Sequence, residues 1–311
     1  MKVGVIGAGV MGSLHSRVYY EIPGVELVGV VDKDLKKAKD VALRYGALAF
    51  DSAEKLIGKV DAVTVAVPTC SHRDVANLFL KNGVDVLVEK PMAFDLKEAE
   101  DMIKTARANK RILMVGHIER FNPTIGALKN IIKNEKIQEI ETRRRNPFVS
   151  RIEDCGIVLD LMVHDIDVVR YLTGERPVVD YVIGGSVKSK HEDWAKVVMK
   201  YGKIPTVHLS DRRTQKKIRK IEVNCEDKLI DADYVNQEIK IYSQAKPVYN
   251  GRPFFSEKIE TIVARGEPLK LELLEFIDAV KNRREPSVTG EEGKKNLEVI
   301  SDIMKKMKVK E

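Results

Sequence analysis

Apolar stretches and amphipathic stretches alternate along the first 118 residues of the chain. Runs of consecutive apolar residues predict strands at 2–9, 25–32, 60–69, 84–91 and 111–117. Between them, apolar residues spaced three or four positions apart predict helices at 10–21, 34–46, 71–83 and 95–110. Strands separated by helices of this length indicate a parallel sheet with helices on both faces. Ligands of such sheets bind at the carboxyl ends of the strands.

Beyond residue 118 the pattern becomes rich in β-strands. It predicts a strand at 137–149, an apolar helix at 156–174, a hairpin at 193–210 and strands at 220–225, 228–235 and 238–243. Two amphipathic helices at 267–283 and 291–308 close the chain. We therefore expect an α/β protein with a parallel-sheet domain at 1–118. A second α/β domain at 119–311 should hold an open, mostly antiparallel sheet, and its final helix could instead pack on the first domain.

Composition supports a soluble globular protein. The 311 residues suit two domains, and 43% of them are hydrophobic and 32% charged. The net charge of +7 is modest, so it fits an anionic small molecule better than nucleic acid. The basic run at 212–220 reads as a solvated turn and strand edge. No apolar run approaches the roughly 20 residues of a membrane span, and three widely spaced cysteines fit a reducing cytoplasm.

A glycine pattern joins the first strand to the first helix. Gly7, Gly9 and Gly12 match the spacing GxGxxG between a strand and a helix. In a dinucleotide-binding turn, the three glycines allow the tight turn, the backbone approach to the pyrophosphate and the close packing of the helix. The free amide groups at Val10 and Met11, at the start of the helix, would face the phosphates. An ordinary strand–turn–helix without a ligand is the alternative.

Asp32 lies 20 residues after Gly12, at the end of the second predicted strand. Its carboxylate could accept hydrogen bonds from both ribose hydroxyls and would repel a 2′-phosphate. We therefore expect NAD rather than NADP, although Lys33 stands beside it.

Polar residues follow the third and fourth predicted strands on this same edge. Glu89 and Lys90 end the fourth strand, and Thr69 ends the third. Lys90 would lie over the nicotinamide end of a dinucleotide, with Glu89 holding it, whereas a surface ion pair is the alternative reading. His72 suits either a cofactor contact or an exposed position at a helix start. A cis bond before Pro91 would fix the direction of Lys90.

The apolar helix at 156–174 carries an acid and a histidine four residues apart. Asp160 and His164 should lie one helical turn from each other. A carboxylate beside an imidazole suits general acid–base catalysis near neutral pH, although a polar pair at the rim of an apolar helix is the alternative. Asp165 and Asp167 fall on other faces and are expected to be solvent-exposed or capping residues. Because no third ligand accompanies the pair at metal spacing, we expect no metal site.

Substrate contacts are expected from residues after the fifth predicted strand and on the strand at 137–149. Arg120 and Asn122 are candidate contacts to hydroxyl or amide groups. Arg143 and Arg145 alternate on one face of a strand, so with Arg151 they could bind a pyrophosphate. A solvated strand rim is the alternative for these arginines.

Together these motifs resemble the glucose–fructose oxidoreductase/inositol dehydrogenase/MocA (Gfo/Idh/MocA) family. The resemblance covers the whole chain and rests on "GVIGAGVMGSLH", "AVPTCSH", "VEKPMAFD", "GHIERFNP" and "DCGIVLDLMVHDIDVVRYLTG". It implies a Rossmann domain, followed by an α/β domain whose open sheet faces a partner subunit in a homodimer or homotetramer. It also implies that Lys90 contacts both substrate and nicotinamide, and that Asp160 and His164 complete the acid–base set.

The sequences at residues 116–123 and 143–148 are most similar to the nucleotide-sugar branch of this family, the UDP-N-acetylglucosamine 3-dehydrogenases. The expected activity is therefore hydride transfer between a sugar alcohol and NAD, on a UDP-sugar such as UDP-N-acetylglucosamine at C3. A free-sugar or inositol dehydrogenase of the same family and a non-catalytic NAD-binding sensor are the alternatives. The expected partners are small molecules, with no nucleic acid or membrane.

Overall fold

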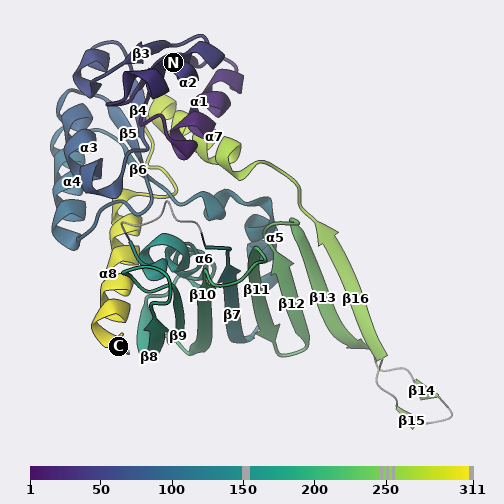
Figure 1. The fold of residues 1–311 in the computed structure, drawn as a ribbon. Coiled ribbons are helices and arrows are strands. Elements are labelled where there is room, and N and C mark those ends of the chain that lie inside the picture. Colours follow the sequence, from purple (N-terminus) through teal and green to yellow (C-terminus); the bar gives the residue numbers. More distant parts are fainter. Residues whose placement is uncertain (149–154, 246–247, 250–251, 254–255, 308–311) are drawn as a thin grey trace. The chain divides into compact units, whose positions relative to one another are not determined.

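The computed structural model describes residues 1–148, 155–245, 248–249, 252–253 and 256–307. The chain divides into two compact units (Figure 1). The first contains residues 1–118 and 268–298, and the second contains residues 119–267 and 299–311. The expected span of 119–311 for the second domain is therefore wrong for residues 268–290, which return to the first unit, whereas the return of residues 291–298 agrees with the possibility that the final helix packs on the first domain. No helix in the described residues is long and apolar enough to cross a membrane.

The first unit is built around a six-stranded parallel sheet of order β3-β2-β1-β4-β5-β6 (Figure 1). Its strands are β1 (Lys2–Ile6), β2 (Glu26–Val31), β3 (Leu48–Phe50), β4 (Ala62–Val65), β5 (Asp85–Glu89) and β6 (Leu113–Gly116). Every residue of β4, β5 and β6 is buried, as expected for strands covered on both faces. The order reverses between β1 and β4, and the crevice at such a point is where parallel sheets bind ligands.

Helices connect these strands and cover the sheet. They are α1 (Val10–Glu21), α2 (Leu35–Arg44), α3 (His72–Lys81) and α4 (Leu96–Ala108), with short 3₁₀ turns at Ala53–Leu56 and Thr69–Ser71. The carboxylate of Asp95 accepts the amide of Glu98 and caps α4. The unit also holds α7 (Pro268–Asn282) and the first residues of α8 (Gly290–Lys306).

The second unit contains an eight-stranded sheet of order β16-β13-β12-β11-β7-β10-β9-β8 (Figure 1). Its strands are β7 (Ile137–Arg145), β8 (Pro177–Gly185), β9 (Trp194–Tyr201), β10 (Ile204–Asp211), β11 (Ile218–Cys225), β12 (Lys228–Asp233), β13 (Glu238–Ala245) and β16 (Ser256–Val263). Among the described strands of this sheet, only β7 and β10 pair in parallel, so the sheet is mostly antiparallel, as predicted.

The helices of the second unit precede and follow β7. They are a 3₁₀ turn at Ile118–Phe121, α5 (Pro123–Ile132), a π-helical turn at Val158–Met162 and α6 (Val163–Thr173). Gly174 ends α6 with a φ of +73°, which favours glycine. Two short strands, β14 (Val248–Tyr249) and β15 (Arg252–Pro253), form a separate ladder.

Candidate functional site

The turn between β1 and α1 has the backbone geometry that its glycines predict. Gly7 has a φ of +103°, and a Cβ there would lie 2.3 Å from the oxygen of Ala66. A Cβ on Gly12 would lie 1.7 Å from the Gly7 oxygen, so the helix packs too closely for any side chain. A Cβ on Gly9 would meet no described atom within 4 Å. The first amide groups of α1 therefore begin beside open space, which suits a dinucleotide pyrophosphate.

Asp32 is fixed beside this turn. Its Oδ2 accepts the amide of Ala8 at 2.8 Å, and its Oδ1 accepts the amide of Asp34 at 2.9 Å. A cavity of about 570 Å³ next to the turn is lined by α1 and α2, including Lys37 and Arg44. The carboxylate is thus held where a ribose diol would meet it.

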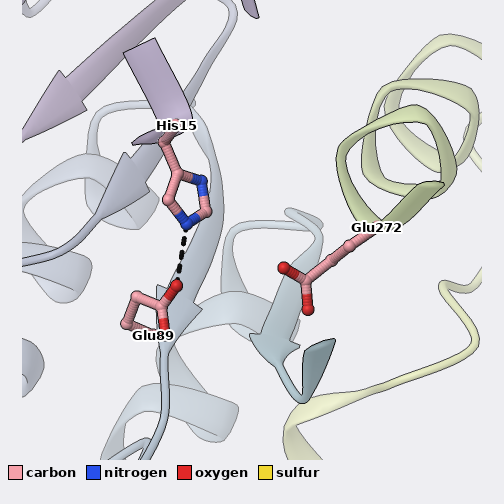
Figure 2. Close-up of side chains that lie close together, drawn as sticks. All are labelled: His15, Glu89 and Glu272. Atoms are coloured by element: carbon pink, nitrogen blue, oxygen red, sulfur yellow. Dashed lines mark hydrogen bonds and ion pairs between the residues drawn. The ribbon is translucent and has the colours of Figure 1, made fainter. Parts of the chain in front are cut away.

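Glu89 belongs to a buried cluster with His15 of α1 and Glu272 of α7 (Figure 2). The His15 Nε2 and Glu89 Oε1 atoms are hydrogen-bonded at 2.7 Å, and one ligand atom from each of the three side chains lies within 4.8 Å of the others. Spacing along the sequence did not reveal this set, which could offer three ligands to a metal. However, two ligands on one Zn²⁺ with bonds of about 2.0 Å lie roughly 3.3 Å apart, so the 2.7 Å contact favours a shared proton.

The cluster continues into Lys90. The second Glu89 oxygen, Oε2, accepts the backbone amide of Lys90 at 3.2 Å, and the Lys90–Pro91 bond is cis. Burial raises the pKa of Glu89, but the hydrogen bond from His15 and the charges of His15 and Lys90 outweigh it and lower that pKa overall. Glu89 is therefore a buried carboxylate fixed between His15 and the Lys90 backbone, rather than half of a surface ion pair.

His72 braces the same edge of the sheet. It is 1% exposed, so its interpretation as an exposed residue at a helix start is wrong. Its Nδ1 lies 3.0 Å from the Pro91 oxygen and its Nε2 lies 2.9 Å from the Val67 oxygen. Burial lowers its pKa, and a neutral ring donates from only one nitrogen. The neutral His72 ring can therefore donate a hydrogen bond to only one of these two carbonyls, which lie just after β4 and β5, and nearby Thr69 is also buried.

In the second unit, Asp160 lies in the π-helical turn and His164 in the first turn of α6. A π turn has i→i+5 hydrogen bonds, so the one-turn relation assumed from an ideal α-helix does not hold strictly here. The side chain of Asp160 is 14% exposed, and its Oδ2 lies 3.8 Å from Nη2 of Arg212. His164 is 8% exposed. Both candidates are thus largely buried, and Asp160 has an unforeseen cationic neighbour.

The two acids that follow His164 are buried and held by arginines, so the expectation that they are solvent-exposed or capping residues is wrong. Asp165 is 2% exposed and accepts two hydrogen bonds from Arg144 Nε and Nη2, at 3.0 and 2.9 Å. Arg144 also donates to Glu119 at 2.9 Å. Asp167 is 1% exposed and binds Arg120 through two hydrogen bonds of 2.7 and 2.8 Å. These charged pairs lock the orientation of α6, and with it His164.

Three of the residues predicted to contact substrate have other partners in the structure. Arg120 is engaged by Asp167. Asn122 is 3% exposed and caps α5 by accepting the amide of Thr124 at 3.1 Å, so its prediction as a hydroxyl contact is replaced by a capping role. Arg143 pairs with Glu222.

Arg143 and Arg145 do share one face of β7, as alternation predicts, but the opposite face carries Thr142 and Arg144, both 0% exposed. Because Arg144 binds Asp165 of α6, the helix-covered face is the one that Arg143 and Arg145 do not occupy. Arg151 lies outside the described residues.

Models of one protein family match both parts of the chain. The model described as "Oxidoreductase family, NAD-binding Rossmann fold" matches residues 1–117. The model described as "Oxidoreductase family, C-terminal alpha/beta domain" matches residues 129–311. The chain belongs to the Gfo/Idh/MocA oxidoreductase family. It is thus an oxidoreductase with an NAD-binding Rossmann fold.

Members of the Gfo/Idh/MocA family with known names resemble the chain along nearly all of its length. The UDP-N-acetylglucosamine 3-dehydrogenase of Acidithiobacillus ferrooxidans is 30% identical over 96% of this chain and 94% of that protein. A crystal form of the same enzyme aligns with a TM-score of 0.90 at 28% identity, covering 99% of this chain and 97% of that one. The myo-inositol 2-dehydrogenase of Thermotoga maritima is 29% identical over 96% of this chain and 93% of that protein.

Sequence reasoning missed one group of cations in this family member. Arg212 was taken as part of a solvated turn, yet it is 3% exposed and lies beside Asp160. Arg219 of β11 lies 3.4 Å from Glu119, which Arg144 also binds. The alternation of β10 and β11 could have shown these positions to be inward-facing, but only once the covered face was known.

Proposed function

We propose that this chain is an NAD-dependent dehydrogenase that oxidises a secondary alcohol of a sugar, carried as a UDP-sugar such as UDP-N-acetylglucosamine and oxidised at C3. The glycine turn between β1 and α1 supports the proposal that NAD binds, since Gly9 leaves space for a pyrophosphate. The relative named for this reaction, which matches along 96% of the chain, supports the substrate part.

NAD is proposed over NADP because the Asp32 carboxylate is held by two backbone amides where a 2′-phosphate would have to enter. Lys37 and Arg44 line the neighbouring cavity, and their positive charges would instead favour the 2′-phosphate of NADP. Titrating both cofactors by calorimetry tests the choice. NADP binding as tightly as NAD would contradict it.

In the proposed mechanism, Lys90 and His164 act on the same alcohol. Oxidation builds negative charge on the alcohol oxygen as its proton leaves, and the Lys90 ammonium would stabilise that charge. His164, in the helix that Arg120 and Arg144 hold in place, would accept the proton as general base. When bound, the nicotinamide supplies the hydride acceptor. Asp160 would orient His164 or balance its charge.

A substrate screen tests the proposal. UDP-N-acetylglucosamine, free N-acetylglucosamine and myo-inositol would each be mixed with the enzyme and NAD, with the reduced-nicotinamide absorbance as the readout. We expect turnover with the UDP-sugar, and loss of at least about 100-fold in turnover for Lys90→Met with NAD binding kept. Turnover of myo-inositol alone would favour the inositol dehydrogenase, which the Thermotoga maritima relative supports. Binding of NAD without turnover of any alcohol would favour a sensor.

We also propose assembly into a homodimer or homotetramer through the sheet of the second unit. Its two edge strands expose large apolar side chains, including Val178 and Tyr181 on β8 and Ile259 and Ile262 on β16. Light scattering after gel filtration tests this. A monomer at micromolar concentration would contradict it.

A further inference from the structure

Strand alternation shows which residues of the second sheet lie on its helix-covered face. Thr206, His208 and Ser210 of β10 are all 0% exposed, and His208 is hydrogen-bonded to Thr142 of β7 at 2.9 Å. This is the face on which Arg144 meets α6. Arg212 directly follows β10, and its contact with Asp160 of the π-helical turn places its side chain on the covered face.

The Arg212 guanidinium is buried without the acceptors that its N–H groups require. Its side chain is 4% exposed, and its nearest charged partner is Asp160, whose Oδ2 lies 3.8 Å from Nη2, beyond hydrogen-bond distance. Among the described residues, neither Nη1 nor Nη2 finds a hydrogen-bond acceptor. Buried polar groups are nearly always hydrogen-bonded in native proteins, so these N–H groups require an acceptor that comes from water or from a ligand.

Arg219 shares this feature in part, because its Nη1 donates to Glu119 at 3.4 Å, and it is accessible. It has the parity of Ile221 and Val223, which are 0% exposed on β11, and its own side chain is 30% exposed. Within the described part of the chain, its buried Nε has no acceptor. Register supports the convergence, because β7 pairs with β10 at Arg145–Asp211 and with β11 at Arg145–Ile218. The residues after β10 and the first residues of β11 therefore meet the same end of β7.

The electrostatics agree with this geometry. The charge of Arg219 and burial both lower the pKa of Lys217, and burial and the charge of Arg144 lower the pKa of Arg219, although the charge of Glu119 acts in the opposite direction on both. Cations that repel one another in this way are stabilised by an anion placed between them.

We propose that Arg212 and Arg219, with Lys217 at the rim, bind an oxyanion carried by the substrate, and that this oxyanion is a phosphoryl group of a nucleoside diphosphate. The site lies beside Asp160, so it would anchor the far part of the substrate next to the helix that bears His164. It deepens the proposed function and rests on it for the nature of the anion. A sugar carboxylate has the same chemistry, and the test separates the two sources.

The test is calorimetric titration of UDP, N-acetylglucosamine and glucuronate into the full-length protein with saturating NAD. Arg212→Gln and Arg219→Gln each remove a donor set, and Lys216→Gln removes an exposed charge from the same segment as the matched control. Loss of one charge-assisted contact should raise the Kd for UDP roughly 10- to 100-fold in both arginine variants. The control should stay within about twofold of the wild type, and the KM for the UDP-sugar should rise with the Kd while kcat changes little.

Other outcomes are separable. UDP-sugar turnover with an unchanged KM in a folded Arg219→Gln variant would overturn this inference and leave the proposed function intact. Arginine-dependent binding of glucuronate but not UDP would keep the oxyanion site and remove the nucleotide from the proposed function. Arg219 is partly exposed, so its variant remains informative if Arg212→Gln fails to fold, and Arg212→Lys should retain part of the affinity.

Discussion

Replacing Gly9 by alanine should separate cofactor binding from folding. The Gly9 backbone has φ −72° and ψ −164°, which alanine adopts without strain, and the added Cβ would meet no described atom within 4 Å. The lower chain entropy of alanine stabilises by about 0.4–1 kcal/mol. The loss of glycine as a helix cap costs a similar amount, about 0.5–1 kcal/mol. The free energy of unfolding should therefore change by less than about 1 kcal/mol.

NAD binding, by contrast, should suffer. The Cβ would occupy the space through which a pyrophosphate approaches the first amides of α1. Each hydrogen bond to a charged group is worth about 1.5–3 kcal/mol, so losing one raises the Kd for NAD roughly 10- to 150-fold. Calorimetric titration with NAD measures this effect, and a thermal melt of the protein without NAD measures stability.

Gly12→Ala is the matched comparison, because it places the same methyl group three residues further on. Its Cβ would lie 1.7 Å from the Gly7 oxygen, so α1 must move away from the turn. Overpacking of this kind costs about 3 kcal/mol or more. At about 2–4 °C per kcal/mol, the melting temperature should fall by about 6–12 °C. Wild-type NAD affinity in Gly9→Ala, or equal melting temperatures for the two variants, would refute the reasoning.

Three further predictions concern stability and the support of Lys90. Arg144→Met leaves two acids without their buried partner, so the free energy of unfolding measured by chemical denaturation should fall by about 3–5 kcal/mol. The control Arg143→Met, on the half-exposed face of β7, should lower it by less than about 1 kcal/mol. Equal losses in the two variants would count against the assignment of the covered face. His15→Phe should lower kcat roughly 10-fold with KM for NAD unchanged, because it removes the hydrogen bond that holds Glu89. His15→Gln should restore kcat, because glutamine keeps a hydrogen-bond donor. If His15→Gln does not restore kcat, the hydrogen bond is not what positions Glu89. Asp193 accepts three backbone amides, and although burial raises its pKa, these bonds lower it to about 2. Its folded pKa lies below the unfolded value, so its contribution to the free energy of unfolding is present above about pH 4 and is lost as pH falls through about 2. Asp193→Asn should therefore weaken the loss of stability at acid pH. An unchanged dependence of stability on acid pH would contradict this role of Asp193.

The sequence predicted the first unit well because its signals are local. Apolar runs, helical spacing and glycines with special backbone angles each act within a few residues, so the strands and helices were found nearly in place. Only the three-residue strand β3 was too short to give a pattern. The return of α7 to the first unit was missed and that of the final helix was only left open, since no local signal tells a helix which sheet to cover.

The site in the second unit was predicted less completely because buried charge depends on tertiary partners. Asp165 and Asp167 look like surface residues until the arginines from distant segments are known. Strand alternation correctly predicted that Arg143 and Arg145 share one face of β7, but it could not predict which face a helix covers. The same limit hid Arg212, whose charge suggested solvent although its side chain is buried.

The most direct test of the central claim is a double-mutant cycle between Lys90 and His164, measured as kcat/KM for UDP-N-acetylglucosamine with saturating NAD. If both side chains act on one alcohol in one transition state, each of Lys90→Met and His164→Ala should lose at least about 100-fold, and the double variant should lose little more than the worse single one. Losses that multiply fully in the double variant would mean that the two residues act independently, and the account would be contradicted.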